Sequence, residues 1–296
     1  MKNQKTLGTA LLLLVAMIWG TAFVFQRMGM ESIGPVTFTA ARMSLAAAAV
    51  GTVSLLRGGR AKKAGAREAV IGGLCCGVFL CTASLFQQAG IVTTTAGKAG
   101  FITALYILLV PVLNLALFKR RCGARVWLAV GLGVVGMYLL CVTEGLRLTK
   151  GDTLVCACAL LFSGHILCCD HFARRADPVR IAAIQFIVVA LLSWIAAFAV
   201  EEPSPAQLRE AAVPILYCGL ISGGVGYTLQ MVAQGMTEPT AASLLMSLES
   251  VFAVLAGALL LHERMSRREL LGCAVMFAAI LLIQLPVRRR AAKATE

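Results

Sequence analysis

The sequence predicts an all-α polytopic membrane protein whose ten transmembrane helices form two inverted five-helix repeats. Three observations support this fold class: an apolar composition, ten long apolar segments, and a similarity between the two halves of the chain. Of 296 residues, 59% are apolar and 14% are charged, whereas soluble domains carry about 25% charged residues. This composition excludes a soluble domain and a disordered chain. The chain is also too long for a small secreted scaffold held together by its eleven cysteines.

Ten segments are apolar and long enough to cross a bilayer core of about 30 Å, which takes about 20 helical residues. Pro35, Pro178 and Pro239 stand directly before three of them, as expected at the start of a helix. The first segment follows Lys2 and Lys5 as a secretory signal would, but it lacks a small-residue cleavage site and is expected to be retained. The expected spans are 7–25, 36–56, 69–91, 99–118, 124–142, 153–169, 179–200, 211–233, 240–261 and 269–286.

The basic residues are distributed unequally between alternate loops. With both termini on one side, the segments on that side hold 18 lysines and arginines, and those on the other side hold 8. Since basic loops remain in the cytoplasm, we expect both termini to be cytoplasmic. The 262–268 loop, which places three arginines on the outer side, is the exception. The net charge of +13 is spread over short loops, so no nucleic-acid partner is expected.

The two halves of the chain match when Trp19 is aligned with Phe162. The first two spans then match the sixth and seventh without gaps. This alignment has an offset of 143 residues. A looser match of Pro111-Val112 with Ser250-Val251 has an offset of 139, as if a few residues were lost in between. The ungapped pairs are Trp19 with Phe162, Gly20 with Ser163, Pro35 with Pro178, Val36 with Val179, Ala40 with Ala183 and Arg42 with Gln185.

Each repeat contains five spans, an odd number, so the second repeat enters the membrane upside down relative to the first. We expect one integrated membrane domain made of residues 1–148 and 149–296. Inverted repeats are typical of secondary transporters, whose substrate site lies near the midplane where the repeats meet. GxxxG motifs at Gly73-Gly77 and Gly219-Gly223, in corresponding spans, predict close helix packing, with a homodimer face as the alternative.

Three strongly polar residues are expected deep in the bilayer. Arg42 lies seven residues past Pro35, about 10 Å along the helix, and a central arginine costs about 2.5–3.5 kcal/mol on insertion scales. We interpret it as a cation that holds an anionic substrate group; a structural ion pair or a side chain reaching the headgroups is the alternative. Gln185, its repeat mate, would either lie beside it or make a structural hydrogen bond between helices. Glu249, near the midplane, would be protonated or paired, and would carry a proton, hold an amino group, or pair with Arg42.

Further polar side chains crowd the third and eighth spans and the helices beside them. One or two would be ordinary contacts between membrane helices, but this many indicate a hydrated pathway. They are Gln87, Gln88, Tyr106, Asn114, Tyr227, Gln230 and Gln234.

The segment that contains His165, Cys168, Cys169 and His171 invites interpretation as a metal site. His165 and Cys169 are four residues apart and share a helix face. However, no second group of cysteines and histidines completes a site in the sequence, and cysteine also behaves as a small buried apolar residue. We therefore expect no metal and no cofactor, and interpret His165 as a residue that lines the pathway.

Several motifs carry a family resemblance. The run Trp19-Gly20-Thr21-Ala22-Phe23 is followed by Pro35 and Arg42, the stretch 86–106 leads to Pro111, Gly151-Asp152 opens the second half, and Ser247–Ala253 precedes Glu263 and Gly272. Together these motifs resemble the EamA-like transporters of the drug/metabolite transporter superfamily, over nearly the whole chain. The resemblance implies ten helices, two inverted repeats and transport of small metabolites across the bacterial inner membrane. Ser250 departs from the proline usual in the family, and Lys119-Arg120-Arg121 lacks a glutamate often found in that loop.

These observations predict a secondary transporter or facilitative carrier that exports small metabolites, such as amino acids or related compounds, by alternating access. No GxxxxGK[ST] motif occurs, so ATP hydrolysis by this chain is not expected. The alternatives are a membrane enzyme acting on lipids and a non-transporting scaffold, but the histidines are dispersed and no enzyme is expected. The expected partners are a small-molecule substrate and membrane lipids. The candidate pathway residues are Trp19, Arg42, Gln88, Tyr106, His165, Gln185, Gln230 and Glu249.

Overall fold

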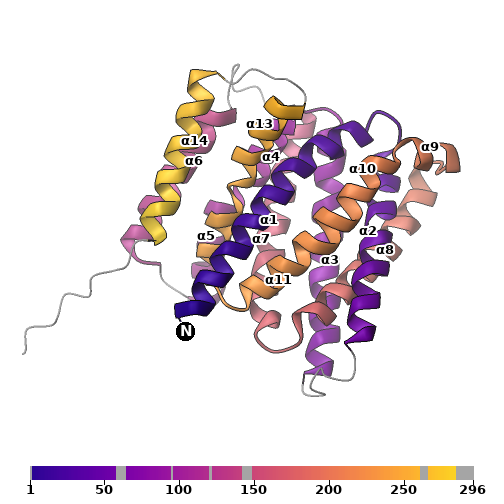
Figure 1. Cartoon of the computed structure of the whole chain (residues 1–296), viewed down its shortest axis with the longest axis horizontal. Coiled ribbons are helices and arrows are strands. Elements are labelled where there is room, and N and C mark those ends of the chain that lie inside the picture. The colour runs from indigo at the N-terminus through magenta and orange to yellow at the C-terminus, as the bar shows by residue number, and fades with distance from the viewer. Residues whose placement is uncertain are drawn as a thin grey trace, which may run out of the picture.

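The computed structural model describes residues 2–57, 65–94, 96–119, 122–141, 149–260 and 266–284, which form helices joined by short turns, without a strand among them (Figure 1). Eight helical segments are long and apolar enough to cross a membrane. Two shorter apolar helices, Ala124–Gly136 and Leu270–Ala279, lie where the fifth and tenth spans are predicted. The all-helical membrane fold is confirmed, and the count of ten spans remains a prediction.

The helices begin and end close to the predicted limits of the spans. The predicted ends at 142, 261 and 286, and most of the 262–268 loop, lie outside the described residues. The helices are α1 (Lys2–Gly29), α2 (Pro35–Leu56), α3 (Ala66–Ile91), α4 (Ala96–Thr103), α5 (Tyr106–Phe118), α6 (Ala124–Cys141), α7 (Lys150–Ala173), α8 (Pro178–Val200), α9 (Pro205–Glu210), α10 (Ala212–Leu216), η1 (Tyr217–Tyr227), α11 (Thr228–Gln234), α12 (Pro239–Met246), α13 (Glu249–Leu260) and α14 (Arg267–Gln284).

The prolines that open the predicted spans do begin helices. Pro35, Pro178 and Pro239 occupy the first position of α2, α8 and α12, where the missing N–H costs nothing. Asp177 caps α8 by accepting hydrogen bonds from the first backbone amides. The free amides of α2 are instead capped from the other half of the chain, because Glu201 accepts from Val36 N at 2.9 Å and from Thr37 N at 2.8 Å.

Helices of the two halves are interleaved, so neither half forms a separate bundle. Helix α2 packs on α8, α6 on α14, α3 on α7, and α1 on η1 and α13. Glycines permit two equivalent crossings: a Cβ on Gly77 would lie 3.2 Å from the Gln185 carbonyl oxygen, and one on Gly219 would lie 2.7 Å from the Arg42 carbonyl oxygen. The GxxxG motifs therefore serve packing inside the chain, against α8 and α2 respectively.

The predicted spans 99–118 and 240–261 are each broken near the middle, which sequence reasoning did not anticipate. Helix α4 ends at Thr103 and α5 begins at Tyr106, while α12 ends at Met246 and α13 begins at Glu249. Both breaks are turns with i→i−3 backbone hydrogen bonds, such as Ile107 N to Ala104 O at 3.0 Å. The two breaks are related by the same offset as Trp19 and Phe162, so the looser match with its shorter offset is wrong in this region.

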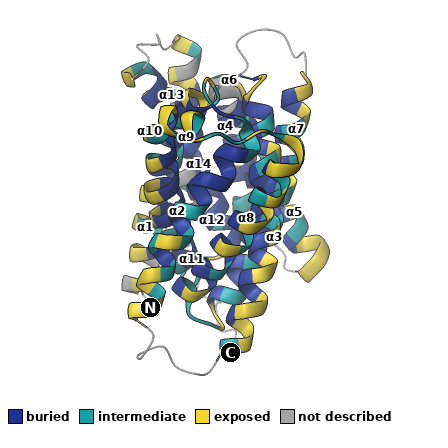
Figure 2. Cartoon of the chain, turned by 90° about the vertical axis from the view of Figure 1, so that its right-hand side faces the viewer, coloured by how far each residue is buried: buried dark blue, intermediate teal, exposed yellow. Residues whose placement is uncertain are grey.

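Most of the side chains between the helices are buried, and the outer surface of the bundle is apolar. Buried residues lie where helices face one another, and exposed residues lie on the outer faces (Figure 2). Large apolar side chains such as Leu191, Ile195 and Phe198 are exposed on α8, as expected for a surface that contacts lipid. Helix α1 begins and α14 ends at the same end of the bundle (Figure 1), as the predicted topology requires.

Candidate functional site

A cavity lies where the helices of the two halves meet. It contains about 440 Å³ of space outside protein atoms, part of it open to solvent. Helices of both halves supply its walls, and both helix breaks contribute to it. The lining residues are Trp19, Ala22, Phe23, Gln26, Arg42, Gln87, Thr103, Tyr106, Phe162, Ile166, Ser222, Tyr227, Gln230 and Glu249.

Tyr106 and Glu249 meet in this cavity at the two helix breaks. Each is the first residue of the helix that follows a break, and they are separated by 143 residues. The Tyr106 hydroxyl donates a hydrogen bond of 2.8 Å to Glu249 Oε1. Both side chains are buried, with exposures of 2% and 3%. Repeat-related positions therefore touch across the junction, and the carboxyl group has one identified donor.

Arg42 brings a cation to the same cavity without a carboxylate partner. Its side chain is 3% exposed, and its Nε has no hydrogen-bond partner. The guanidinium carbon lies 5.6 Å from the centroid of the Phe38 ring, one turn earlier on α2. In the described part of the chain no ion pair joins Arg42 to Glu249, so the interpretation of the two as a structural pair is not supported by this structure. A buried donor beside empty space can hold an anionic group.

Aromatic side chains form another part of the wall. Trp19 and Tyr227 lie with ring centroids 4.7 Å apart, and Trp19 Nε1 donates to the Ser222 carbonyl oxygen at 3.2 Å. Tyr227 ends η1, a π-helix that contains four glycines. Wide π-turns often occur at functional sites because they re-aim side chains, and here the turn carries Ser222 and Tyr227 into the cavity.

Two glutamines add hydrogen-bonding groups from equivalent positions. Gln87 on α3 and Gln230 on α11 are repeat mates at the same offset as Tyr106 and Glu249, and both line the cavity. Gln87 Nε2 donates to Thr103 Oγ1 at 3.1 Å. Gln230 Oε1 has no partner in the described structure, so it is available to a bound molecule.

The structure brings five of the eight predicted pathway residues into one cavity: Trp19, Arg42, Tyr106, Gln230 and Glu249. Gln88 is buried and does not line it. Sequence reasoning missed smaller and apolar lining residues such as Ala22 and Phe162. The repeat offered a signal for Phe162, because it is the counterpart of Trp19.

His165 and Gln185 do not line the cavity but bond to each other. His165 Nε2 and Gln185 Oε1 lie 3.1 Å apart, and both side chains are fully buried. The His165 ring stands edge-on to Tyr227, with centroids 5.9 Å apart, so the pair lies directly behind the aromatic wall. This supports the structural interpretation of Gln185 and makes His165 a support of the wall rather than part of its surface.

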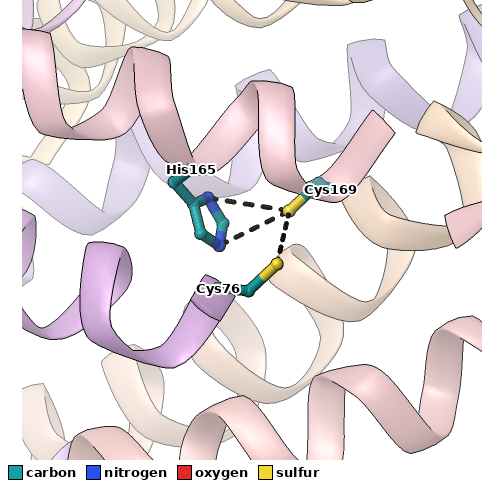
Figure 3. Close-up of side chains that lie close together, drawn as sticks. All are labelled: Cys76, His165 and Cys169. Atoms are coloured by element: carbon teal, nitrogen blue, oxygen red, sulfur yellow. Dashed lines mark hydrogen bonds between the residues drawn. The ribbon is translucent and has the colours of Figure 1, made fainter. Parts of the chain in front are cut away.

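His165 also belongs to a cluster that the sequence did not reveal. Cys76, from α3, approaches His165 and Cys169 on α7, and the three are fully buried (Figure 3). A single cysteine from another helix thus joins the pair, and the expectation that no metal binds stays a prediction. Sequence reasoning had no means of knowing that α3 crosses α7 at this level.

Comparisons with known proteins agree with this architecture. The model of the EamA-like transporter family matches the chain twice, over residues 6–142 and 149–285. An uncharacterized transporter of Archaeoglobus fulgidus is 29% identical over 277 residues, covering 93% of this chain and 85% of the relative. The uncharacterized transporter YwfM of Bacillus subtilis is 26% identical over 294 residues, covering 94% of each. A solved crystal structure shares the fold with a TM-score of 0.78 at 17% identity, covering 96% of this chain and 99% of that one. Two matches that together span nearly all of the sequence show that the chain belongs to the EamA-like transporter family.

Proposed function

We propose that this membrane transporter is a secondary or facilitative carrier that moves a small polar metabolite through the cavity at the repeat junction. One observation carries the proposal: Arg42, with its free Nε, and the Tyr106–Glu249 pair face the same cavity, from helices of both halves. Buried ionisable groups inside a membrane protein usually mark a substrate or ion pathway.

The chemistry of the walls favours an amino-acid-like substrate. Arg42 would hold a carboxylate, because its planar fork of donors matches that group. Glu249 would accept from an amino group, and Gln87 and Gln230 would supply further hydrogen bonds. Trp19 and Tyr227 would cover the apolar part of such a molecule.

Transport through this cavity would require the helices to move. The centre of a water molecule fits in only about 30 Å³ of the cavity, which is room for few waters and no metabolite. The two halves would therefore rock against each other around the site, as in other carriers with inverted repeats. The broken helices α4–α5 and α12–α13 are suited to this, because their turns can bend without unfolding a whole span.

We further propose that the chain resides in a bacterial inner membrane, with both termini cytoplasmic, and exports its substrate. The bias of basic residues motivates this orientation. Single cysteines on a cysteine-free background test it: Ala206→Cys, exposed on α9, should react with an impermeant maleimide added to intact cells, and Ala291→Cys should not. The reverse pattern would overturn the orientation.

The transport proposal is tested with purified protein in liposomes. Vesicles loaded with an unlabelled candidate metabolite are diluted into a trace of the labelled compound, across a panel of amino acids, organic acids and sugars. We expect protein-dependent counterflow for at least one compound that carries a carboxylate. Counterflow only for compounds without an anionic group would contradict the role given to Arg42. Its absence for every compound would contradict the carrier.

A further inference from the structure

We propose that Cys76, His165 and Cys169 form a binding site for a soft metal ion, of the class of Zn²⁺ and Cu(I), where α3 crosses α7. One ligand atom from each residue lies within 4.8 Å of the other two. All three side chains are fully buried. The site is separate from the cavity, because none of the three lines it.

The separations suit a tetrahedral metal centre. Cys76 Sγ and Cys169 Sγ are 4.0 Å apart, and Cys169 Sγ lies 3.5 Å from His165 Nε2 and 3.8 Å from Nδ1. With metal–sulfur bonds of about 2.3 Å and metal–nitrogen bonds of about 2.0–2.1 Å, tetrahedral ligand atoms lie roughly 3.5–3.8 Å apart. Small side-chain rotations would therefore complete the coordination without separating the helices.

A neighbouring side chain sets the tautomer of the histidine. Gln185 Oε1 lies 3.1 Å from His165 Nε2, so an Nε2–H that donates to this oxygen leaves the Nδ1 lone pair for a metal. Cys169 Sγ lies 3.5 Å from Nε2 and 3.8 Å from Nδ1, so the ring would turn to bring Nδ1 to the ion. Metal-binding histidines almost always donate their other ring N–H to an acceptor of this kind. Gln185 is fully buried and would fix the tautomer.

The donor set selects the class of metal. Two thiols and one imidazole favour soft ions over Mg²⁺ or Ca²⁺. Zn²⁺ would displace the two thiol protons to solvent and bind two thiolates and a neutral imidazole, which leaves a centre without net charge. Such a neutral centre avoids most of the cost of a buried charge. Met231 and Cys168 pack in the same apolar cluster and surround the site with further sulfur.

Cobalt binding tests the site without any reference to transport. Purified, fully reduced protein is titrated with Co²⁺, whose visible bands report tetrahedral geometry and whose near-ultraviolet absorption reports thiolate ligation. We expect one equivalent to bind with both signatures and Zn²⁺ to displace it. Cu(I) supplied from a chelator then tests the second ion, and the ion that displaces Co²⁺ at the lower free concentration is the preferred ligand.

Matched variants tie the signal to these residues. Cys76→Ser and Cys169→Ser should each lose about half of the thiolate absorption and bind at least about tenfold more weakly, while Gln185→Leu should bind about 10- to 100-fold more weakly. Cys81→Ser, another buried thiol on α3 that faces Ser193 at 3.7 Å, should bind like wild type. If either cluster variant cannot be purified, the other serves, and a rise in the wild-type unfolding midpoint with Zn²⁺ that Gln185→Leu lacks is the second readout. No thiolate band in the wild-type protein, or a band of wild-type strength in both Cys76→Ser and Cys169→Ser, would overturn the site.

Discussion

Two equivalent regions of the molecule differ in one respect that locates the cavity. Arg42 and Ala22 line the cavity, whereas their repeat counterparts, Gln185 and His165, bond to each other and lie outside it. The second half thus has an imidazole where the first has a methyl group. Arg42 Nε has no hydrogen-bond partner, and the methyl group of Ala22 cannot supply the contact that His165 makes to Gln185.

The same contrast extends along the helices. Gln26 lines the cavity, and its counterpart Cys169 lies in the thiol cluster. A cysteine directly precedes the glycine at each of the two equivalent crossings: Cys76 precedes Gly77, and Cys218 precedes Gly219. Cys218 Sγ lies 3.9 Å from the Ala22 carbonyl oxygen. We call the region of Ala22, Gln26 and Arg42 the cavity end. We call the region of their counterparts, His165, Cys169 and Gln185, the packed end. The two repeats share their helix arrangement, and the cavity lies where their side chains differ.

The largest expected effect concerns the charge at the cavity end. Arg42→Ala should lower counterflow about 10- to 100-fold, because charge-assisted hydrogen bonds to a bound anion contribute about 1.5–3 kcal/mol. Arg42→Lys keeps the charge and should retain partial activity, and Arg209→Ala, exposed on α9, should match wild type. A folded Arg42→Ala protein with normal counterflow would remove Arg42 from the site.

Making the cavity end resemble the packed end should close it. The double variant Ala22→His, Arg42→Gln recreates the pair found at the packed end, so it should fold well and lose counterflow by about tenfold or more. Ala22→Ser adds only a hydroxyl group and should stay within about twofold of wild type. Both liposome exchange and the thermal unfolding midpoint are measured, and a double variant that exchanges at the wild-type rate would show that the empty space is not the pathway.

The carboxyl group of Glu249, which lines the cavity, tests coupling to protons. Under that hypothesis Glu249→Gln still exchanges substrate but no longer accumulates it when a pH difference is imposed, because glutamine cannot titrate. Tyr106→Phe removes the 2.8 Å hydrogen bond to Glu249 and keeps the carboxyl group, so accumulation should persist. Wild-type protein that ignores the pH difference would end the coupling hypothesis and indicate a uniporter.

The smallest effect is expected at the packed end and concerns stability. His165→Ala leaves the buried Gln185 oxygen without its partner, which should cost about 1–3 kcal/mol. His171→Ala, at the exposed end of the same helix, is the control. Thermal unfolding in detergent measures both, and equal midpoints for His165→Ala and wild type would mean that the hydrogen bond contributes nothing.

The sequence predicted the frame better than the site. Apolar length and prolines such as Pro35 and Pro178 located the helices, because these signals are local. The deep polar residues Arg42 and Glu249 were predictable for the same reason, since their cost in a membrane is independent of their neighbours. The helix breaks were not predictable, because residues 104–105 and 247–248 include no proline or glycine. Hydrogen bonds such as the one from Ser247 Oγ to the Leu244 carbonyl oxygen at 2.7 Å stabilise the turns instead.

Contacts between distant helices could not be predicted from one sequence. Cys76 joins His165 only because α3 crosses α7, and no local pattern records that crossing. The inequality of the two ends has the same origin. The match of Arg42 with Gln185 was visible in the sequence, but the neighbours that fill one region and leave the other empty were not.

Solvent access at two repeat-related positions tests most directly whether the cavity end, and not the packed end, is the substrate pathway. Two proteins on a cysteine-free background each carry one cysteine, either Gln26→Cys at the cavity end or the native Cys169 at the packed end. As the cavity opens during transport, a water-soluble maleimide should label Gln26→Cys much faster than Cys169, and a transported substrate should slow the labelling of Gln26→Cys alone. Equal labelling of the two positions, with no protection by substrate, would mean that the cavity end is not the substrate pathway.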